Sequence, residues 1–404
     1  MTEPVKGFKD FTGEEAKLRE EIRKILVRNF EIYGFEPAES PIIEQEEFVR
    51  GENTNDEAVS DIFKLEDKGK RKLALRYEQT FQLKRIAQNK KLPYKRFSIG
   101  PVFRDEPVTG NRFRQFTQCD IDTISSSFKE EAEILVMTSK ILKELGINAI
   151  INFNNRKLMN EILDEQKIVN KEEVIREIDK LDKLPKEEVK ANLKKYKAEK
   201  LVEIFEQKES FFKKYKAYKE IQELKEFCKL YGIEINFQPT LARGLAYYNG
   251  SVYEVKNSTG ILDAQKSKQE SKISDIKTKE LKETICAGGS YLINGMQSTG
   301  ISFGLERLSM LTKLKQENKE VLIISLEQDK KAIELAEELR KQGTRVIIMY
   351  GKPSKALEYA NSYSIPKVIF IGEDEVKKKK LKIKDMKSGK EEFLAEKEII
   401  KKFD

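Results

Sequence analysis

Apolar residues near the start of the chain follow the spacing of an amphipathic helix. They are Leu18, Ile22, Ile25, Leu26 and Phe30. Because this spacing puts them on one face, the segment is predicted to be a long helix that runs to Gly34. Thr12 and Glu15 have the sequence pattern of a capping box, so the helix is predicted to begin there.

After this helix, the pattern changes to short segments that are typical of strands. Residues 35–43 include Pro37 and Pro41, which favours an edge or interface strand over a central one. The pattern then predicts strands near residues 73–76 and 96–103, and a helix over residues 130–145 that ends at Gly146. The first part of the chain is therefore predicted to combine helices with strands that are joined mainly by hairpins.

Residues 103–122 alternate aromatic and arginine side chains in the manner of a β-hairpin. A turn is predicted at residues 108–111, and Arg104, Arg112 and Arg114 would lie on the two strands. A planar guanidinium group matches phosphate oxygens, so arginines held in this way could grip separate phosphates of one nucleotide. For this segment alone, a solvated hairpin with surface ion pairs is an equally open interpretation.

The middle of the chain has a different character. Residues 155–231 are dense in lysine and glutamate and keep helical spacing of apolar residues, so they are predicted to form a helical insertion. Strands are predicted again at residues 233–237 and 251–255. Residues 264–282 are predicted to form a polar, lysine-rich loop.

In the last part of the chain, three β-rich runs alternate with helical patterns. The runs are residues 321–325, 345–350 and 368–372. This alternation predicts a small, separate α/β domain with right-handed crossovers. The lysine run at residues 377–380 is interpreted as a solvated edge.

Composition narrows the classes of function. The chain has 404 residues, enough for roughly two to three domains, and no histidine, which excludes imidazole as base, nucleophile or metal ligand. The net charge of +8, from 77 basic and 69 acidic residues, allows a nucleic-acid partner without requiring one. Cys119, Cys228 and Cys286 lack disulfide or metal spacing, and no apolar run reaches membrane-spanning length. We therefore expect a cytoplasmic protein with no membrane association.

The sequence lacks the usual glycine-rich phosphate-binding loops. It has neither a Walker-type loop nor a dinucleotide fingerprint, so any nucleotide would have to be held by arginines. Two further segments supply them: residues 241–254, reading LARGLAYYNGSVYE, and residues 300–311, reading GISFGLERLSML.

The three arginine-bearing segments together resemble the signature blocks of class II aminoacyl-tRNA synthetases, and specifically of the histidyl-tRNA synthetase family. Residues 34–41 resemble the first motif, which is a dimer-interface strand, residues 103–116 the second and residues 300–307 the third. The LARGLAYYNG block and the paired glycines Gly288 and Gly289 are similar to blocks peculiar to the histidine enzymes.

The resemblance implies a fold class and a division into domains. The fold would be an α+β catalytic domain built on an antiparallel sheet, with its first part in residues 1–154 and its second part in residues 232–316. A helical insertion would occupy residues 155–231, and an anticodon-binding-like α/β domain would occupy residues 320–404.

For ATP, the resemblance implies roles for five positions. Arg104 would hold the α-phosphate, Arg112 the γ-phosphate and Glu106 the adenine amino group. Phe116 would stack on the adenine, and Arg307 would complete the nucleotide clamp. Mg²⁺ is expected to bind mainly through the ATP phosphates, and no metal site made of protein side chains is predicted.

For the amino acid, the resemblance implies a second set of positions. Glu78, Thr80 and Gln118 match positions that receive the ammonium group of histidine. Asp122 and Tyr248 match the pair that reads the imidazole. A buried carboxylate and a phenol can together hydrogen-bond both ring nitrogens.

The implied activity is adenylation of L-histidine by ATP, followed by transfer to the 3′ end of tRNA(His). The enzyme would be a homodimer whose interface includes residues 34–41. Arg243 matches an arginine at the α-phosphate, so Arg243 and Arg104 are the expected catalytic residues. Because the attacking carboxylate is already ionised, this step needs alignment and charge neutralisation rather than a base. A protein without histidine can carry it out.

The sequence departs from the family pattern in two places. In and around the amino-acid pocket, Ala246 stands where an aspartate is common, Ser290 and Leu292 replace a usual arginine and aspartate, and Asp122 is shorter than the frequent glutamate. These changes could loosen the pocket without affecting the ATP clamp. The turn at residues 108–111 carries Val108 and Thr109 where more polar residues are common, which leaves its reading of tRNA open.

Two other interpretations remain open. One is the non-catalytic relative that serves as regulatory subunit of ATP phosphoribosyltransferase; the C-terminal domain and Arg104, Arg112, Arg243 and Arg307 argue against it. The other is a synthetase of the same subclass for another amino acid, which only the LARGLAYYNG block argues against.

Overall fold

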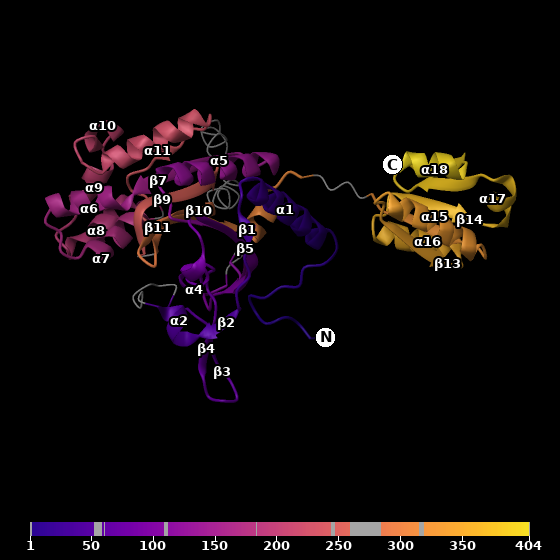
Figure 1. Ribbon diagram of the computed structural model, residues 1–404, viewed down its shortest axis with the longest axis horizontal. Coiled ribbons are helices and arrows are strands. Elements are labelled where there is room, and N and C mark those ends of the chain that lie inside the picture. Colours follow the sequence, from indigo (N-terminus) through magenta and orange to yellow (C-terminus); the bar gives the residue numbers. More distant parts are fainter. Residues whose placement is uncertain are drawn as a thin grey trace. The chain divides into compact units, whose positions relative to one another are not determined.

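The computed structural model of the chain describes residues 2–51, 59, 61–108, 112–182, 184–243, 247–258, 284–314 and 319–403. The predicted loop at residues 264–282 lies outside these residues. The chain divides into two compact units, Met1–Leu314 and Lys315–Asp404, which are described separately below (Figure 1). Among the described helices, none is both long enough and apolar enough to cross a membrane.

An eight-stranded sheet forms the centre of the first unit. Its order is β1 (Glu36–Pro37), β5 (Tyr94–Phe103), β6 (Gln115–Ile124), β11 (Met296–Gly304), β10 (Thr284–Ile293), β9 (Tyr248–Asn257), β7 (Ala149–Asn155) and β8 (Asn236–Phe237). Only the outermost pairs, β1 with β5 and β7 with β8, are parallel. The expected antiparallel α+β fold is confirmed, and β1 is an edge strand as its prolines predicted.

The two faces of this sheet differ in chemistry. On β6, Cys119 and Ile121 join Phe97 and Phe303 in the main hydrophobic core. Helices α1 (Gly13–Ile32) and α5 (Phe128–Glu144) cover that face, and the smaller sheet lies on the other side (Figure 1). Because side chains alternate along a strand, Asp120 and its neighbours two positions away point to the opposite, polar face.

Helix α1 agrees with the spacing of its apolar residues, but not with the predicted cap. Its buried residues are Ile22, Leu26 and Phe30. Thr12 is the N-cap residue, yet within the described part of the chain its side chain makes no capping hydrogen bond. Glu15 instead pairs with Lys9 at 2.7 Å, so the second half of the predicted capping box is used by an ion pair.

Six α-helices and one 3₁₀-helix account for most of the described residues between 156 and 230. They are α6 (Arg156–Glu165), α7 (Lys171–Ile178), η2 (Asp179–Asp182), α8 (Lys186–Lys194), α9 (Leu201–Phe205), α10 (Glu209–Phe212) and α11 (Tyr218–Leu230). Their apolar residues belong to the same core cluster as α1, α5 and the sheet. The helical segment therefore shares its core with the rest of the unit.

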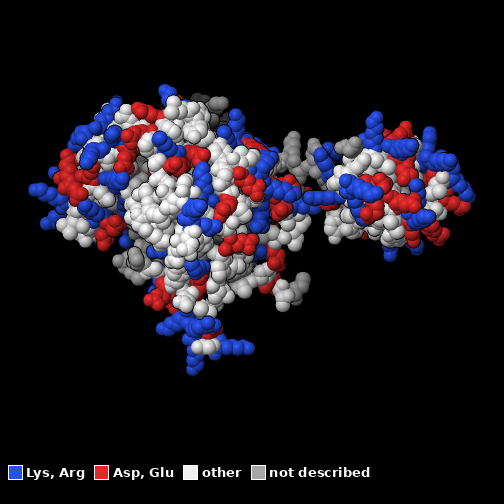
Figure 2. All heavy atoms as spheres, viewed as in Figure 1, with Lys and Arg blue, Asp and Glu red and all other residues white. Residues whose placement is uncertain are grey.

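A second, three-stranded sheet lies next to the main one. It consists of β2 (Ile43–Gln45), β4 (Lys72–Leu75) and β3 (Lys64–Glu66), and α2 (Glu46–Arg50), α4 (Leu83–Ile86) and η1 (Ala87–Asn89) are its neighbours in sequence. Lysine and arginine gather at the tip of the β3–β4 hairpin, where Lys68, Lys70 and Arg71 are exposed (Figure 2).

The arginine-bearing connection between β5 and β6 corrects one prediction. The strands pair as a hairpin, but β5 ends at Phe103 and β6 begins at Gln115, so the three arginines lie between the strands instead of on them. The backbone N–H groups here bond elsewhere: that of Asp105 donates to Asp61 at 2.7 Å, and that of Arg114 to Gly7 at 2.8 Å. Residues 109–111 of the predicted turn lie outside the described residues.

The second unit is an α/β domain. Its sheet has the order β13 (Val346–Tyr350), β12 (Val321–Ser325), β14 (Lys367–Ile371), β15 (Leu381–Asp385) and β16 (Glu391–Leu394). Its helices are α15 (Asp329–Lys341), α16 (Pro353–Ser362), α17 (Glu373–Lys378) and α18 (Glu396–Lys402). Strand β12 is parallel to both neighbours and buried on both faces, which explains its unbroken apolar sequence. The predicted α/β class is confirmed.

Candidate active site

A small cavity of about 70 Å³ lies on the polar face of the main sheet. Seven of the site residues predicted from the sequence line it: Glu78, Thr80, Arg104, Gln118, Asp122, Arg243 and Tyr248. They come from separate parts of the sequence, namely the segment after β4, the ends of β5 and β6, and the segment that leads into β9. The fold therefore brings all five residues predicted for the amino acid together with the two predicted catalytic arginines.

Glycines keep this face of the sheet open. A Cβ atom on Gly288 would lie 2.0 Å from the carbonyl oxygen of Gly300, and one on Gly300 would lie 2.3 Å from Oδ1 of Asp122. A Cβ atom on Gly289 would lie 2.5 Å from the carbonyl oxygen of Ser251. Any side chain at these positions would push the strands apart or enter the cavity.

Asp122 is held from two sides. Its carboxylate forms a buried ion pair with Arg96 at 2.6 Å, and the hydroxyl group of Tyr291 donates a hydrogen bond to it. Burial raises the pKa of Asp122, while Arg96 acts to lower it. Sequence analysis did not single out Tyr291; its position two residues after Gly289, on a strand beside the cavity, was the available signal.

Tyr248 lies beside this carboxylate within a group of three tyrosines. Its ring centroid is 4.8 Å from that of Tyr247 and 6.4 Å from that of Tyr291. All three line the small cavity. The predicted pair of Asp122 and Tyr248 thus faces one space, with Tyr291 as a third member.

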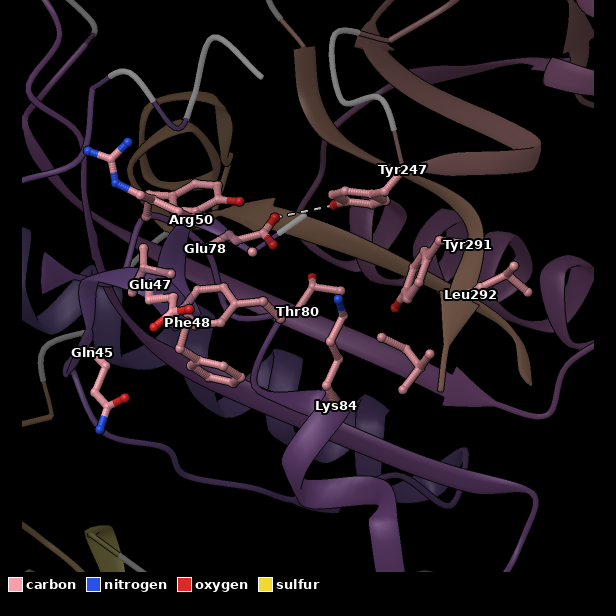
Figure 3. Close-up of a pocket in the computed structure, with 15 residues that line it drawn as sticks. Gln45, Glu47, Phe48, Arg50, Glu78, Thr80, Lys84, Tyr247, Tyr291 and Leu292 are labelled. Atoms are coloured by element: carbon pink, nitrogen blue, oxygen red, sulfur yellow. Dashed lines mark hydrogen bonds between the residues drawn. The ribbon is translucent and has the colours of Figure 1, made fainter. Parts of the chain in front are cut away.

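Glu78 points toward Tyr247, which donates a hydrogen bond to it at 3.2 Å (Figure 3). Burial, and next the negative charge of Asp120, raise the pKa of Glu78 to about 7. Burial likewise raises the pKa of Asp120 to about 7. Asp120 lines the cavity as well and was not predicted from the sequence.

A larger pocket of about 650 Å³ adjoins the small cavity. The two share Glu78, Thr80, Tyr247 and Tyr291. Figure 3 shows Phe48, Arg50 and Lys84 around the larger space. Leu292, one of the departures from the family pattern, also lines it and is 50 % exposed.

Arg243 has an unusual backbone conformation, with φ at 63° in the left-handed region. Its backbone N–H donates to Oδ1 of Asp179, on η2, at 2.9 Å. Strain of this kind persists where the surroundings hold the residue in place. Its side chain lies 3.8 Å from Glu254, and among the described residues its buried Nε has no hydrogen-bond partner.

The residues predicted for ATP fall into two pairs and one separate arginine. The guanidinium carbon of Arg104 lies 5.1 Å from the ring centroid of Phe116, and Arg112 lies 3.6 Å from Glu106. Arg307, on α14 (Leu305–Leu311), donates a hydrogen bond to the carbonyl oxygen of Thr284 at the start of β10. Of these five residues, only Arg104 lines the small cavity.

Two other departures from the family pattern differ in what the structure describes. Ser290 is buried and donates a hydrogen bond to the buried carboxylate of Glu131 on α5. Ser290 is thus bonded toward the helical layer, and it does not line the cavity. Ala246 lies outside the described residues.

Metal binding by the protein alone finds no support in the described part of the chain. Within it, no group of three or more acidic or cysteine side chains is arranged to hold a metal ion. The donors of the cavity are instead carboxylates, phenols and guanidinium groups. This set suits a charged organic substrate and phosphate groups better than a bare cation.

Comparison with known proteins identifies the family. Residues 7–260 match the family model described as histidyl-tRNA synthetase, and residues 320–404 match the model described as anticodon binding domain. The chain is 32% identical to a Bacillus cereus histidine--tRNA ligase, with 96% of each chain covered. A Wolinella succinogenes histidine--tRNA ligase is 33% identical, with 95% of this chain and 93% of the relative covered.

The chain belongs to the histidyl-tRNA synthetase family. Solved structures support the fold of this family member. A histidyl-tRNA synthetase from Nostoc sp. PCC 7120 superposes with a TM-score of 0.81 at 24% identity and covers 99% of this chain and 98% of its own. A structure from Bacillus halodurans C, titled as an ATP phosphoribosyltransferase regulatory subunit/histidyl-tRNA synthetase, gives 0.69 at 19% identity and covers 89% and 96%. Synthetases and regulatory subunits thus share the fold, so the fold does not choose between them.

Proposed function

We propose that this protein is a histidine--tRNA ligase, which activates L-histidine with ATP and transfers it to the 3′ end of tRNA(His). The observation that carries the proposal is the small cavity. All five residues predicted for the amino acid line it, and so do Arg104 and Arg243. Close relatives over nearly the whole chain are named histidine--tRNA ligases, which supports the same activity.

Recognition of the imidazole is assigned to the carboxylate of Asp122 and the phenol of Tyr248. The ion pair with Arg96 and the hydrogen bond from Tyr291 orient the carboxylate, so it can accept a hydrogen bond from a ring N–H of histidine. The Tyr248 hydroxyl can serve the other ring nitrogen. The ammonium group is assigned to Glu78, Thr80 and Gln118, which line the same cavity.

Adenylate formation is assigned to alignment and charge neutralisation. The carboxylate of histidine attacks the α-phosphorus while Arg104 and Arg243 stabilise the charge that develops on the phosphate oxygens. Phe116, which stacks on the adenine in this proposal, lies beside Arg104. Glu106 would bind the adenine amino group, and Arg112 and Arg307 the outer phosphates. Mg²⁺ would bind through the ATP phosphates and neutralise part of their charge.

Transfer to tRNA completes the proposed reaction. The terminal hydroxyl of the tRNA must lose a proton, and a phosphate oxygen of the adenylate is the proposed acceptor. The second unit, which matches the anticodon binding model, would bind the anticodon region. We further propose that the enzyme acts in the cytoplasm as a homodimer, with residues 34–41 at the interface. The proposed division of the first unit is a catalytic domain in residues 1–154 and 232–316 that carries the insertion 155–231.

The regulatory subunit of ATP phosphoribosyltransferase is the second candidate, because one of its namesakes has this fold. It requires neither ATP chemistry nor an arginine at the α-phosphate. A cavity that combines buried acids with Arg104 and the strained Arg243 favours catalysis instead. A synthetase for another amino acid is the third candidate, since the departures at Ser290 and Leu292 lie close to the pocket.

Amino-acid-dependent exchange between ATP and pyrophosphate tests all three candidates. The assay is run with each of the twenty amino acids on the wild type, on Arg243→Ala and on the control Arg345→Ala, whose side chain is 60% exposed. We expect exchange with histidine that is lost in Arg243→Ala and kept in Arg345→Ala. Silence with every amino acid would favour the regulatory subunit, and exchange with a different amino acid would reassign the specificity.

A further inference from the structure

Asp120 lines the small cavity, although neither the family resemblance nor the proposed reaction gives it a role. It lies on β6 between Gln118 and Asp122, and the alternation of the strand points all three to the same face. The residue is 3% exposed. Burying a carboxylate without a charged or hydrogen-bonded partner is costly, so a group at this depth calls for a partner.

Two neighbouring acceptors in the cavity have no donor. Among the described residues, Oδ1 of Asp120 and Oε1 of Gln118 are buried and make no hydrogen bond. Alternate residues of a strand are roughly 7 Å apart, so one small cationic group between the two side chains can reach both. The carboxylate of Glu78 faces the same cavity and accepts one hydrogen bond, from Tyr247.

The buried cations nearby are already engaged. Arg96 is paired with Asp122 at 2.6 Å. Arg76 donates to the carbonyl oxygens of Pro101 at 2.8 Å and of Ser40 at 3.0 Å. The two arginines that line the cavity are assigned to phosphate oxygens in the proposed reaction. The acids of the cavity therefore lack a cation that the substrate can supply.

We propose that Asp120 binds the α-ammonium group of the amino-acid substrate, together with Glu78 and Gln118. An ammonium group has three N–H donors and no acceptor, which matches one donor for each of these side chains. The inference rests on the proposed function, because it takes the ligand of this cavity to be an amino acid. It adds a second negative charge to the ammonium site that the family positions alone imply.

Calorimetric titration with two ligands tests this role. L-Histidine and 3-(imidazol-4-yl)propionate differ only in the ammonium group, and both are titrated into the wild type, Asp120→Asn and the control Asp164→Asn, whose side chain is 66% exposed. A charge-assisted hydrogen bond is worth about ten- to a hundredfold in affinity. We expect Asp120→Asn to lose about that factor for histidine and to bind the propionate as the wild type does.

A structural role for Asp120 gives a different pattern. Equal losses for both ligands, a parallel loss of ATP affinity, or unchanged histidine affinity would overturn the inference. An Asp120→Ser variant repeats the titration with a smaller side chain, and the thermal unfolding midpoint of each variant identifies any that fails to fold. If the wild type binds no histidine, the proposed function falls as well; if it binds histidine and both variants match it, only the inference falls.

Discussion

Two strands of this protein, β6 in the first unit and β12 in the second, lie at the centre of their domains and bury their side chains in opposite ways. Strand β12 carries Leu322, Ile323 and Ile324, which face two separate apolar cores. Strand β6 presents Cys119 and Ile121 to one apolar core, and acids to the other face. One strand fills both faces, whereas the other keeps one face for chemistry.

The difference shows what a functional site costs a sheet. Apolar side chains on both faces of β12 are stabilising wherever they are buried. The acids on β6 are buried at a cost and need Arg96, tyrosine hydroxyl groups or a ligand to offset it. The glycines that face β6 on β10 and β11 add no packing of their own and keep space for a ligand.

The largest expected effect is on the packed strand. Ile323→Ala removes a fully buried side chain from β12, so the free energy of unfolding of the second unit should fall by about 2–5 kcal/mol. Ile333→Ala, on the surface of α15 and 46% exposed, should change it by less than about 0.5 kcal/mol. Chemical denaturation measures both. Equal losses would mean that the apolar face of β12 does not stabilise this unit.

The pH dependence of stability should distinguish the two strands next. Glu78 and Asp120 have pKa values near 7 in the folded protein, above the ordinary range for acids. Between about pH 4 and 7 the folded protein holds protons that the unfolded chain releases, so their contribution to stability is present below pH 4 and is lost as the pH rises. Asp120→Asn should therefore flatten the decline in the free energy of unfolding of the ligand-free protein, by on the order of 2 kcal/mol. Parallel curves for variant and wild type would contradict this account.

Closing the open face should abolish most of the activity. A side chain at Gly288 collides with the backbone of Gly300, so Gly288→Val should displace the strands around the cavity and lower histidine-dependent exchange by about a hundredfold. Gly69→Val is the control, since the nearest atom to a Cβ there is 3.4 Å away in a flexible side chain. An active Gly288→Val enzyme would show that the cavity is not where the amino acid binds.

The smallest expected effect concerns the orientation of one carboxylate. Tyr291→Phe removes the hydroxyl that donates to Asp122, so KM for histidine should rise about tenfold while KM for ATP stays the same. Tyr350→Phe, at a position 58% exposed on β13, is the matched control. Steady-state exchange kinetics measure both constants, and a change in KM for ATP instead would place Tyr291 in the nucleotide site.

Much of the architecture could be predicted because local patterns control it. The apolar spacing of α1, the prolines of edge strand β1 and the alternation of strands and helices in the second unit all appear in the structure. The capping box failed because Glu15 found a nearer partner in Lys9. The arginine hairpin was shorter than predicted because Asp105 and Arg114 bond to residues 61 and 7, which no local pattern reveals.

The candidate site divides along the same line. Residue type, order and spacing were enough to name Glu78, Gln118, Asp122 and Arg243, because the blocks that carry them are contiguous in the sequence. The roles of Asp120 and Tyr291 could not be found in this way. An aspartate or tyrosine on a strand looks the same whether it faces water or a cavity, and its partners are distant in the chain.

The sequence by itself determined which residues alternate along each strand, where helices begin, and which chemistry an enzyme without histidine can perform. Only the tertiary structure decided which face of the sheet carries the chemistry, and which acids share one buried space. The reason is physical: alternation is a local property of the backbone, whereas the burial and pairing of Asp120 and Asp122 depend on strands more than 150 residues away, where Tyr291, Gly300 and Ser302 meet them.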